Sequence, residues 1–257
     1  MIAVDNIVKL FGGLNAVDGC SFNVPTGSIT GLIGPNGAGK TTMFNIIAGF
    51  IDPNAGHVTL DGEDVTGLPP HKLFHRGLVR TFQIPHEFDR MTLRENLMIV
   101  PASQAGENLL NTLFRPGRVT AQEHRIREQA EEVLNFLNLS HLADELAGRL
   151  SGGQKKLLEL GRTMMTDAKV VLLDEPGAGV NRTLLAHLAD DIRRLNRERG
   201  YTFCIIEHDM DLIASLCNPV IVMAHGKVLT EGRMDEIRKD ERVLEAYLGG
   251  QLTEESA

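Results

Sequence analysis

The 257-residue chain lacks several features that mark special classes of protein. Its three cysteines (Cys20, Cys204 and Cys217) are widely separated and have no Cys-x-x-Cys spacing. They fit reduced, buried thiols of a cytosolic protein better than disulfides or a zinc site. The longest apolar runs, such as 46–51 and 170–173, are far shorter than the roughly 20 residues that a membrane-spanning helix requires.

Basic charge is also scarce. The chain has 26 Lys and Arg residues against 34 Asp and Glu residues, a net charge of −8, and a pI of about 5.6. This balance argues against a protein that binds nucleic acid. A strand-like pattern starts at once with Ile2, Val4 and Ile7, so we expect no signal peptide in this sequence. No internal repeat is present, and the composition is ordinary for a globular protein.

Strand-like and helical segments alternate over much of the chain. Helical patterns cover 40–48 and 183–195. Runs rich in β-branched residues predict strands at 20–24, 29–33, 57–60, 79–82, 170–173, 203–206 and 220–223. Such alternation predicts an α/β fold with a mostly parallel sheet.

The middle of the chain has a different pattern. From 92 to 165 there is helical periodicity and no strand candidate. We therefore expect a core made of 1–83 and 167–249, a helical subdomain inserted at 84–166, and a polar tail at 250–257. Within the subdomain, 101–119 mixes Gly, Pro and Asn and is expected to be an irregular excursion.

The clearest motif is a phosphate-binding loop of the form G-x-x-x-x-G-K-[ST], placed between a strand and a helix. Its glycines would let backbone N–H groups close around phosphates. Lys40 would reach the β- and γ-phosphates, and the Thr41 hydroxyl would hold Mg²⁺. The alternative is a glycine-rich turn with an accidental Lys-Thr pair. The predicted ATP-binding residues of this segment are Gly34, Pro35, Asn36, Gly37, Ala38, Gly39, Lys40, Thr41 and Thr42.

Two carboxylates end the apolar run at 170–173. The carboxyl end of a parallel strand is where α/β sheets bind ligands. Asp174 is expected near Mg²⁺, and Glu175 is expected to orient and deprotonate an attacking water. The alternative is a strand that simply ends in solvated acids.

A third motif, Leu-Ser-Gly-Gly-Gln, begins a helix at 150–154. Ser151 and Gln154 have capping-box spacing, which gives a purely local explanation. Capping does not require Gly152 and Gly153, however, and two glycines leave space for an anion at the helix N-terminus. With this motif, the phosphate-binding loop and Val-Val-Leu-Leu-Asp-Glu, the chain resembles the ATP-binding subunits of ABC (ATP-binding cassette) transporters.

That resemblance implies roles for further residues. Phe11 occupies the position of the aromatic residue that stacks on adenine, with Val17 beside it, although a core Phe explains Phe11 equally well. Gln83 matches the glutamine that joins Mg²⁺ and the γ-phosphate to the helical insertion. His208 matches the histidine that contacts the γ-phosphate, which makes it a catalytic residue together with Glu175 and Lys40.

Other segments resemble the subfamily that imports branched-chain amino acids. They are 80–83 (Arg-Thr-Phe-Gln), 101–119, 206–210, 243–249 and 177–181, where Asn181 replaces the usual Asp. The implied function is ATP hydrolysis that drives amino-acid import. The implied partners are a second ATPase subunit, identical or related, in a head-to-tail dimer, a membrane permease and indirectly a substrate-binding protein.

The same resemblance implies attachment to the inner face of the cell membrane. Because the segment 84–97 begins where Gln83 meets the helical insertion, we expect the permease to dock there. The alternative is that Ile84, Phe88 and Met91 only pack the subdomain. In the dimer, Ser151, Gly152, Gly153 and Gln154 would bind ATP held by the other subunit. Three alternatives remain: a related urea or amide system, a lipopolysaccharide system, and a soluble ABC ATPase outside transport. Net negative charge and a single phosphate-binding loop disfavour the last.

Overall fold

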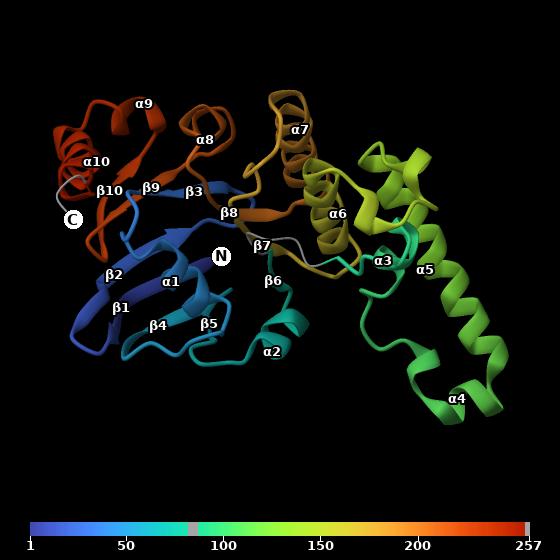
Figure 1. The fold of residues 1–257 in the computed structure, drawn as a ribbon. Helices are drawn as coiled ribbons and strands as arrows, with labels where there is room; N and C mark the ends of the chain where they lie inside the picture. The colour runs from blue at the N-terminus through green and yellow to red at the C-terminus, as the bar shows by residue number, and fades with distance from the viewer. Residues whose placement is uncertain (82–86, 255–257) are drawn as a thin grey trace. The chain divides into compact units, whose positions relative to one another are not determined.

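A computed structural model describes residues 1–81 and 87–254 of the chain, with side chains to 248 (Figure 1). The chain divides into two compact units. Unit 1 comprises 1–83, 169–178 and 192–257, and unit 2 comprises 84–168 and 179–191.

A six-stranded sheet in unit 1 carries the predicted parallel strands. The strand order is β10-β9-β3-β8-β7-β6, and all neighbours are parallel except β9 and β10. The predicted α/β fold with a mostly parallel sheet is thus confirmed. The strands are β3 (Ile29–Ile33), β6 (Leu78–Arg80), β7 (Val170–Asp174), β8 (Thr202–Ile206), β9 (Val220–Ala224) and β10 (Lys227–Gly232).

The remaining strands of unit 1 form a second, antiparallel sheet, which the sequence analysis did not separate from the first. Its order is β2-β1-β4-β5. These strands are β1 (Ile2–Phe11), β2 (Leu14–Val24), β4 (Ala55–Leu60) and β5 (Glu63–Asp64).

The apolar core of unit 1 joins side chains of both sheets to α1 (Lys40–Ile47). Met43 and Phe44 of α1 are fully buried in it, together with Ile7 and Cys20. All three cysteines are buried and free, as predicted. Burial raises the pKa of Cys20 and of Cys217 to about 12, so both stay protonated at neutral pH. The other helices of this unit are α2 (Pro70–His75), α8 (Met210–Leu216), α9 (Met234–Ile237) and α10 (Glu241–Glu254).

Unit 2 is helical. It contains α3 (Leu93–Met98), α4 (Leu109–Phe114), α5 (Pro116–Phe136) and α6 (Gly152–Met164), with 3₁₀ turns at Ala105–Glu107, Ser140–Leu142 and Ala147–Arg149. Residues 92–165, all of which the structure describes, include no β-strand, as predicted. Helix α6 packs closely on its neighbours because Gly161 has no side chain: a Cβ there would lie 2.9 Å from Leu137 and 3.3 Å from Leu97.

Three segments differ from the sequence-based expectations. The excursion at 101–119 is more regular than expected, because Asn108 accepts from the N–H of Leu110 and starts α4. Helix α10 continues to Glu254, into the segment expected to be a tail. Residues 179–191, expected in the core, group with unit 2, so α7 (Arg182–Arg199) begins in one unit and ends in the other. None of the helices among the described residues is long and apolar enough to cross a membrane.

Candidate functional site

The phosphate-binding loop connects β3 to α1, and its three glycines have different roles. All have positive φ, at 149° for Gly34, 76° for Gly37 and 96° for Gly39. A Cβ atom would lie 2.0 Å from the backbone oxygen of Met223 if added at Gly34, and 2.4 Å from that of Ala16 if added at Gly39. At Gly37 it would meet no atom of the described residues within 4 Å. Packing therefore requires glycine at Gly34 and Gly39, whereas Gly37 borders open space.

Lys40 is the first residue of α1, and its ammonium group is buried in the loop. Its Nζ donates to the backbone oxygens of Gly34 at 2.7 Å and Pro35 at 3.0 Å. Burial lowers the pKa of Lys40, and the negative charges of Glu175 and Asp174 oppose that shift. The lysine therefore lies within electrostatic reach of both carboxylates that the sequence analysis selected.

Asp174 ends β7, and its buried carboxylate forms an ion pair with Arg80 at the end of the neighbouring strand β6. The Nη2 of Arg80 lies 2.7 Å from Oδ2 of Asp174, and the two side chains are 5% and 6% exposed. The Nη1 of Arg80 donates to Oδ1 of Asn45 in α1. The guanidinium carbon lies 5.7 Å from the ring centroids of Phe44 and Phe50. Arg80 thus links Asp174 to the helix that follows the phosphate-binding loop.

Glu175 lies one residue beyond β7 in a left-handed conformation, with φ of 49°, that is unusual for this residue type. Its backbone N–H donates to the oxygen of Ile206 at the end of β8, 2.9 Å away. Its Oε1 lies 3.1 Å from Nε2 of His208. Since β7 and β8 are parallel neighbours, their carboxyl ends bring these two side chains together. Strained backbone of this kind is frequent at active sites.

Glu207 was not among the predicted site residues, but it shapes the segment around His208. The Glu207 side chain is buried and accepts from the N–H groups of Gly177 at 2.6 Å and His208 at 2.8 Å. Glu207 therefore connects the segment that follows Glu175 to the segment that contains His208. The position of Glu207 directly after an apolar strand could have identified it as a candidate site residue. Arg80 was also missed, and its charge at the end of β6 could have identified it.

The predicted adenine contacts have unequal surroundings. The side chain of Phe11 at the end of β1 is 48% exposed, so the alternative that it is a core residue is wrong. The Nζ of Lys9 lies 5.3 Å from its ring centroid. Val17 is fully buried in the core and would have to become exposed to contact a base. Gln83 lies outside the described residues, so its role stays a prediction.

The Ser-Gly-Gly-Gln segment of unit 2 forms the N-terminus of α6. Ser151 and Gln154 make both hydrogen bonds of a capping box, at 3.4 Å and 2.9 Å, which confirms the local explanation. A Cβ at Gly153 would lie 2.2 Å from Leu184, so this glycine makes room for the chain itself and not for a ligand. Gly152 is exposed, and a Cβ there would meet its nearest described atom at 3.8 Å. Of the two glycines, Gly152 alone keeps space open at this helix end.

Asn181, which the family resemblance implies replaces an Asp, directly precedes α7. Its Oδ1 accepts from the N–H of Leu184 at 3.0 Å, and its backbone oxygen accepts from the N–H of Leu185 at 2.9 Å. Asn caps a helix as well as Asp does. The replacement therefore keeps the local structure and removes one negative charge.

Comparisons with known proteins agree with this geometry. The profile of the family described as ABC transporter matches residues 17–178, and that of the branched-chain amino acid ATP-binding cassette transporter family matches residues 227–252. The chain is 42% identical to the probable branched-chain amino acid transport ATP-binding protein LivG of Archaeoglobus fulgidus, covering 99% of this chain and 97% of the relative. It is 39% identical to the high-affinity branched-chain amino acid transport ATP-binding protein BraF of Pseudomonas aeruginosa, covering 97% and 98%.

Solved structures of ATP-binding cassettes are also similar to this chain. A nucleotide-free ATP-binding cassette from an ABC transporter matches with a TM-score of 0.83 and 40% identity, covering 96% of this chain and 98% of the other. The ADP conformation of an ATP-binding cassette of an ABC transporter also matches with a TM-score of 0.83 and 40% identity, covering 97% and 98%.

Proposed function

Because this chain belongs to the ABC transporter family, as one of its ATP-binding subunits, we propose that it hydrolyses ATP to drive import of branched-chain or other hydrophobic amino acids through a separate permease. The transported substrate is inferred from the names of relatives that align over nearly the full chain. The observation that supports hydrolysis most strongly is the grouping of Glu175, His208 and Lys40 at one edge of the six-stranded sheet.

In this proposal the phosphate-binding loop holds the β- and γ-phosphates of ATP. Lys40 exchanges the carbonyl oxygens of Gly34 and Pro35 for phosphate oxygens, because a charge-assisted hydrogen bond to phosphate is stronger than one to a neutral carbonyl. Glu175 orients the attacking water and accepts its proton. In the absence of ATP, Nε2 of His208 lies within hydrogen-bond distance of that carboxylate; with ATP bound, it donates to the γ-phosphate instead.

The residues at this edge also fit Mg²⁺. Thr41 is exposed at the first turn of α1, and Asp174 supplies a carboxylate at the end of β7 in the same unit. Among the described residues no group of three or more His, Cys, Asp or Glu side chains could hold a metal alone. That donor set suits Mg²⁺, which takes few protein ligands and completes its shell with phosphate oxygens and water. When bound, the ion would neutralise phosphate charge.

We further propose that the active unit is a head-to-tail dimer attached to the inner face of the membrane. In it, ATP lies between the phosphate-binding loop of one subunit and the Ser151–Gln154 segment of its partner. Two features support this. The exposed Ser151 and Gly152 form a second anion-binding helix start in unit 2. A two-fold arrangement completes both sites at once.

The permease is proposed to dock on residues 84–97 of unit 2, of which the structure describes 87–97. Asn96 is fully buried there and fixes the turn that precedes α3: its Nδ2 lies 3.1 Å from the oxygen of Phe88 and 3.0 Å from that of Thr92. Phe88 stays 47% exposed beside Arg162. An exposed aromatic side chain on a rigid turn is a suitable anchor for a protein interface.

The test replaces Glu175 with Gln in the subunit purified with its permease. ATP binding should persist, while hydrolysis falls by about 10² to 10⁴, the usual cost of removing a general base. Glu132→Gln, on the exposed face of α5, is the matched control and should keep the parental rate. A Glu175→Gln rate close to the parental rate would refute the catalytic assignment. Uptake of labelled leucine by vesicles that hold the complete transporter tests the substrate separately.

A further inference from the structure

The short helix α4 of unit 2 has the reverse of the usual surface arrangement. A surface helix normally turns its apolar side inward. In α4 the four large apolar side chains all face solvent: Leu109 is 85% exposed, Leu110 66%, Leu113 72% and Phe114 71%. The polar Thr112 turns back to the chain instead, with its Oγ1 3.2 Å from the oxygen of Gly106. Four adjacent exposed side chains of this size mark an interaction surface.

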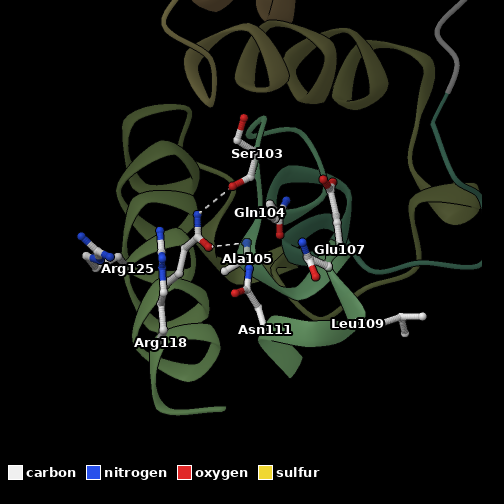
Figure 2. Close-up of a pocket in the computed structure, with 10 residues that line it drawn as sticks. Ser103, Gln104, Ala105, Glu107, Leu109, Asn111, Arg118 and Arg125 are labelled. Carbon is white, nitrogen blue, oxygen red and sulfur yellow. Dashed lines mark hydrogen bonds between the residues drawn. The ribbon is translucent and has the colours of Figure 1, made fainter. Parts of the chain in front are cut away.

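A polar pocket with two arginines borders this apolar surface. It has a volume of about 560 Å³, and Leu109 belongs to both the pocket and the apolar side of α4. Figure 2 shows Arg118 and Arg125 on one side of the pocket and Glu107 and Leu109 on the other. Gln122 ties the two sides together: it accepts from the N–H of Ala105 at 2.6 Å. The pocket is therefore a built feature of unit 2.

The segment formed by α4 and the start of α5 is basic, although the whole chain is acidic. Residues 109–127 contain four arginines (Arg115, Arg118, Arg125 and Arg127) and one carboxylate, Glu123, in a chain with net charge −8. Glu107 of the pocket and Glu128 lie on either side of this segment. All four arginines are exposed, and none forms an ion pair with another residue in the described part of the chain. Figure 1 shows α4 at the end of the long helix α5 within unit 2.

We propose that α4 and the neighbouring arginines form a membrane-contact surface that binds bilayers containing anionic phospholipids. The apolar side chains of α4 enter the boundary between headgroups and acyl chains, and Arg118 and Arg125 bind headgroup phosphates. An exposed apolar surface flanked by arginines is the composition of interfacial membrane-binding segments. A protein groove would suit the leucines, but it would not explain the unpaired arginines beside them. This contact is additional to the attachment through a permease and does not depend on it.

The chain has no tryptophan, so one introduced tryptophan reports on this surface alone. Leu113→Trp should show a blue-shifted emission when phosphatidylcholine vesicles contain phosphatidylglycerol, and a much smaller shift with phosphatidylcholine alone. The shift should weaken as salt is added, because ions screen the arginine–phosphate attraction. Leu14→Trp is the matched control, because Leu14 is 68% exposed but lies in β2 of unit 1. Its emission should not change.

Vesicle flotation of the subunit without permease then measures separately what the apolar side chains and the arginines contribute to membrane binding. Leu113→Gln and Phe114→Gln should each weaken association about tenfold, from the lost burial of one large apolar side chain. Arg118→Gln should weaken it about fivefold, and only with phosphatidylglycerol present. These side chains are exposed, so the thermal unfolding midpoint should not change. An unshifted Leu113→Trp spectrum, equal shifts at Leu14 and Leu113, or a shift that requires the permease would overturn the proposal, and the last result would identify a protein interface.

Discussion

The phosphate-binding loop of unit 1 and the Ser151–Gln154 segment of unit 2 are both glycine-rich turns at the start of a helix, but they are built differently. Before α1, the residue at the cap position is Gly39 in a left-handed conformation, and no side chain of the described residues caps the helix. Before α6, Ser151 and Gln154 satisfy each other's backbone N–H groups. The glycines of the second segment do not have positive φ.

This difference supports the proposal that the loop before α1 binds phosphates by itself, whereas the segment before α6 only adds to such a site. No side chain of the described residues caps α1, so its first N–H groups and the buried ammonium of Lys40 are suited to bind phosphates. At α6 the capping box already uses two N–H groups, so an anion finds mainly the Ser151 hydroxyl and the space beside Gly152. The second segment is therefore suited to complete a site that another phosphate-binding loop begins.

The substitution with the strongest predicted effect breaks the buried ion pair between Arg80 and Asp174, next to the phosphate-binding loop. Arg80→Met should lower the free energy of unfolding by about 3–5 kcal/mol, because it leaves the Asp174 carboxylate buried without its partner. Chemical denaturation measures this. Adding Asp174→Asn to Arg80→Met should recover part of the loss, since the uncompensated charge is then gone. Equal stability of Arg80→Met and the parent would show that the pair does not fix Asp174.

Two glycine substitutions in the phosphate-binding loop test whether Gly34 is required for packing and Gly37 for ligand binding. Gly34→Ala should destabilise the protein by about 3 kcal/mol, because its Cβ meets a backbone oxygen that cannot move alone. Gly37→Ala should cost only about 1 kcal/mol, from the left-handed conformation. It should instead weaken ATP binding, which titration with a fluorescent ATP analogue measures. Identical stabilities would contradict this division.

At the start of α6, Gly153 is likewise expected to serve packing and Gly152 to serve ligand binding, with smaller changes in stability. Gly153→Ala should cost about 1–2 kcal/mol, because the crowding atom is the end of the flexible Leu184 side chain. Gly152→Ala should change stability by less than about 0.5 kcal/mol, as is usual at open surface positions. It should, however, lower ATP-dependent dimerisation, measured by size-exclusion chromatography. Normal dimerisation of Gly152→Ala would mean that this space binds nothing.

Local patterns predicted the parts of the fold that neighbouring residues determine. The apolar runs placed β3, β7 and β8, and the glycine pattern placed the loop before α1. Strand β10 was missed because its residues are only partly buried, and the strand therefore has no continuous apolar run.

Contacts between distant segments could not be predicted in this way. Arg80 and Asp174 are 94 positions apart and meet because β6 and β7 are neighbours in the sheet. Gly153 looked like ligand space because nothing nearby in the sequence indicated Leu184 as its neighbour. The likeness to a known family predicted roles for single residues, but it did not predict which of them touch.

The proposed head-to-tail dimer requires Lys40 of one subunit and Ser151 of another to form one ATP site. The direct measurement mixes Ser151→Arg protein with Lys40→Ala protein, each expected to form no competent site alone. The mixture should form ATP-dependent dimers with one occupied pocket, built from Lys40 of the first variant and Ser151 of the second. Parental ATPase activity should also rise more than linearly with dilute protein concentration. If Ser151→Arg alone is fully active and the parental rate is strictly linear in concentration, Ser151 is only a helix cap and the proposed shared ATP site is wrong.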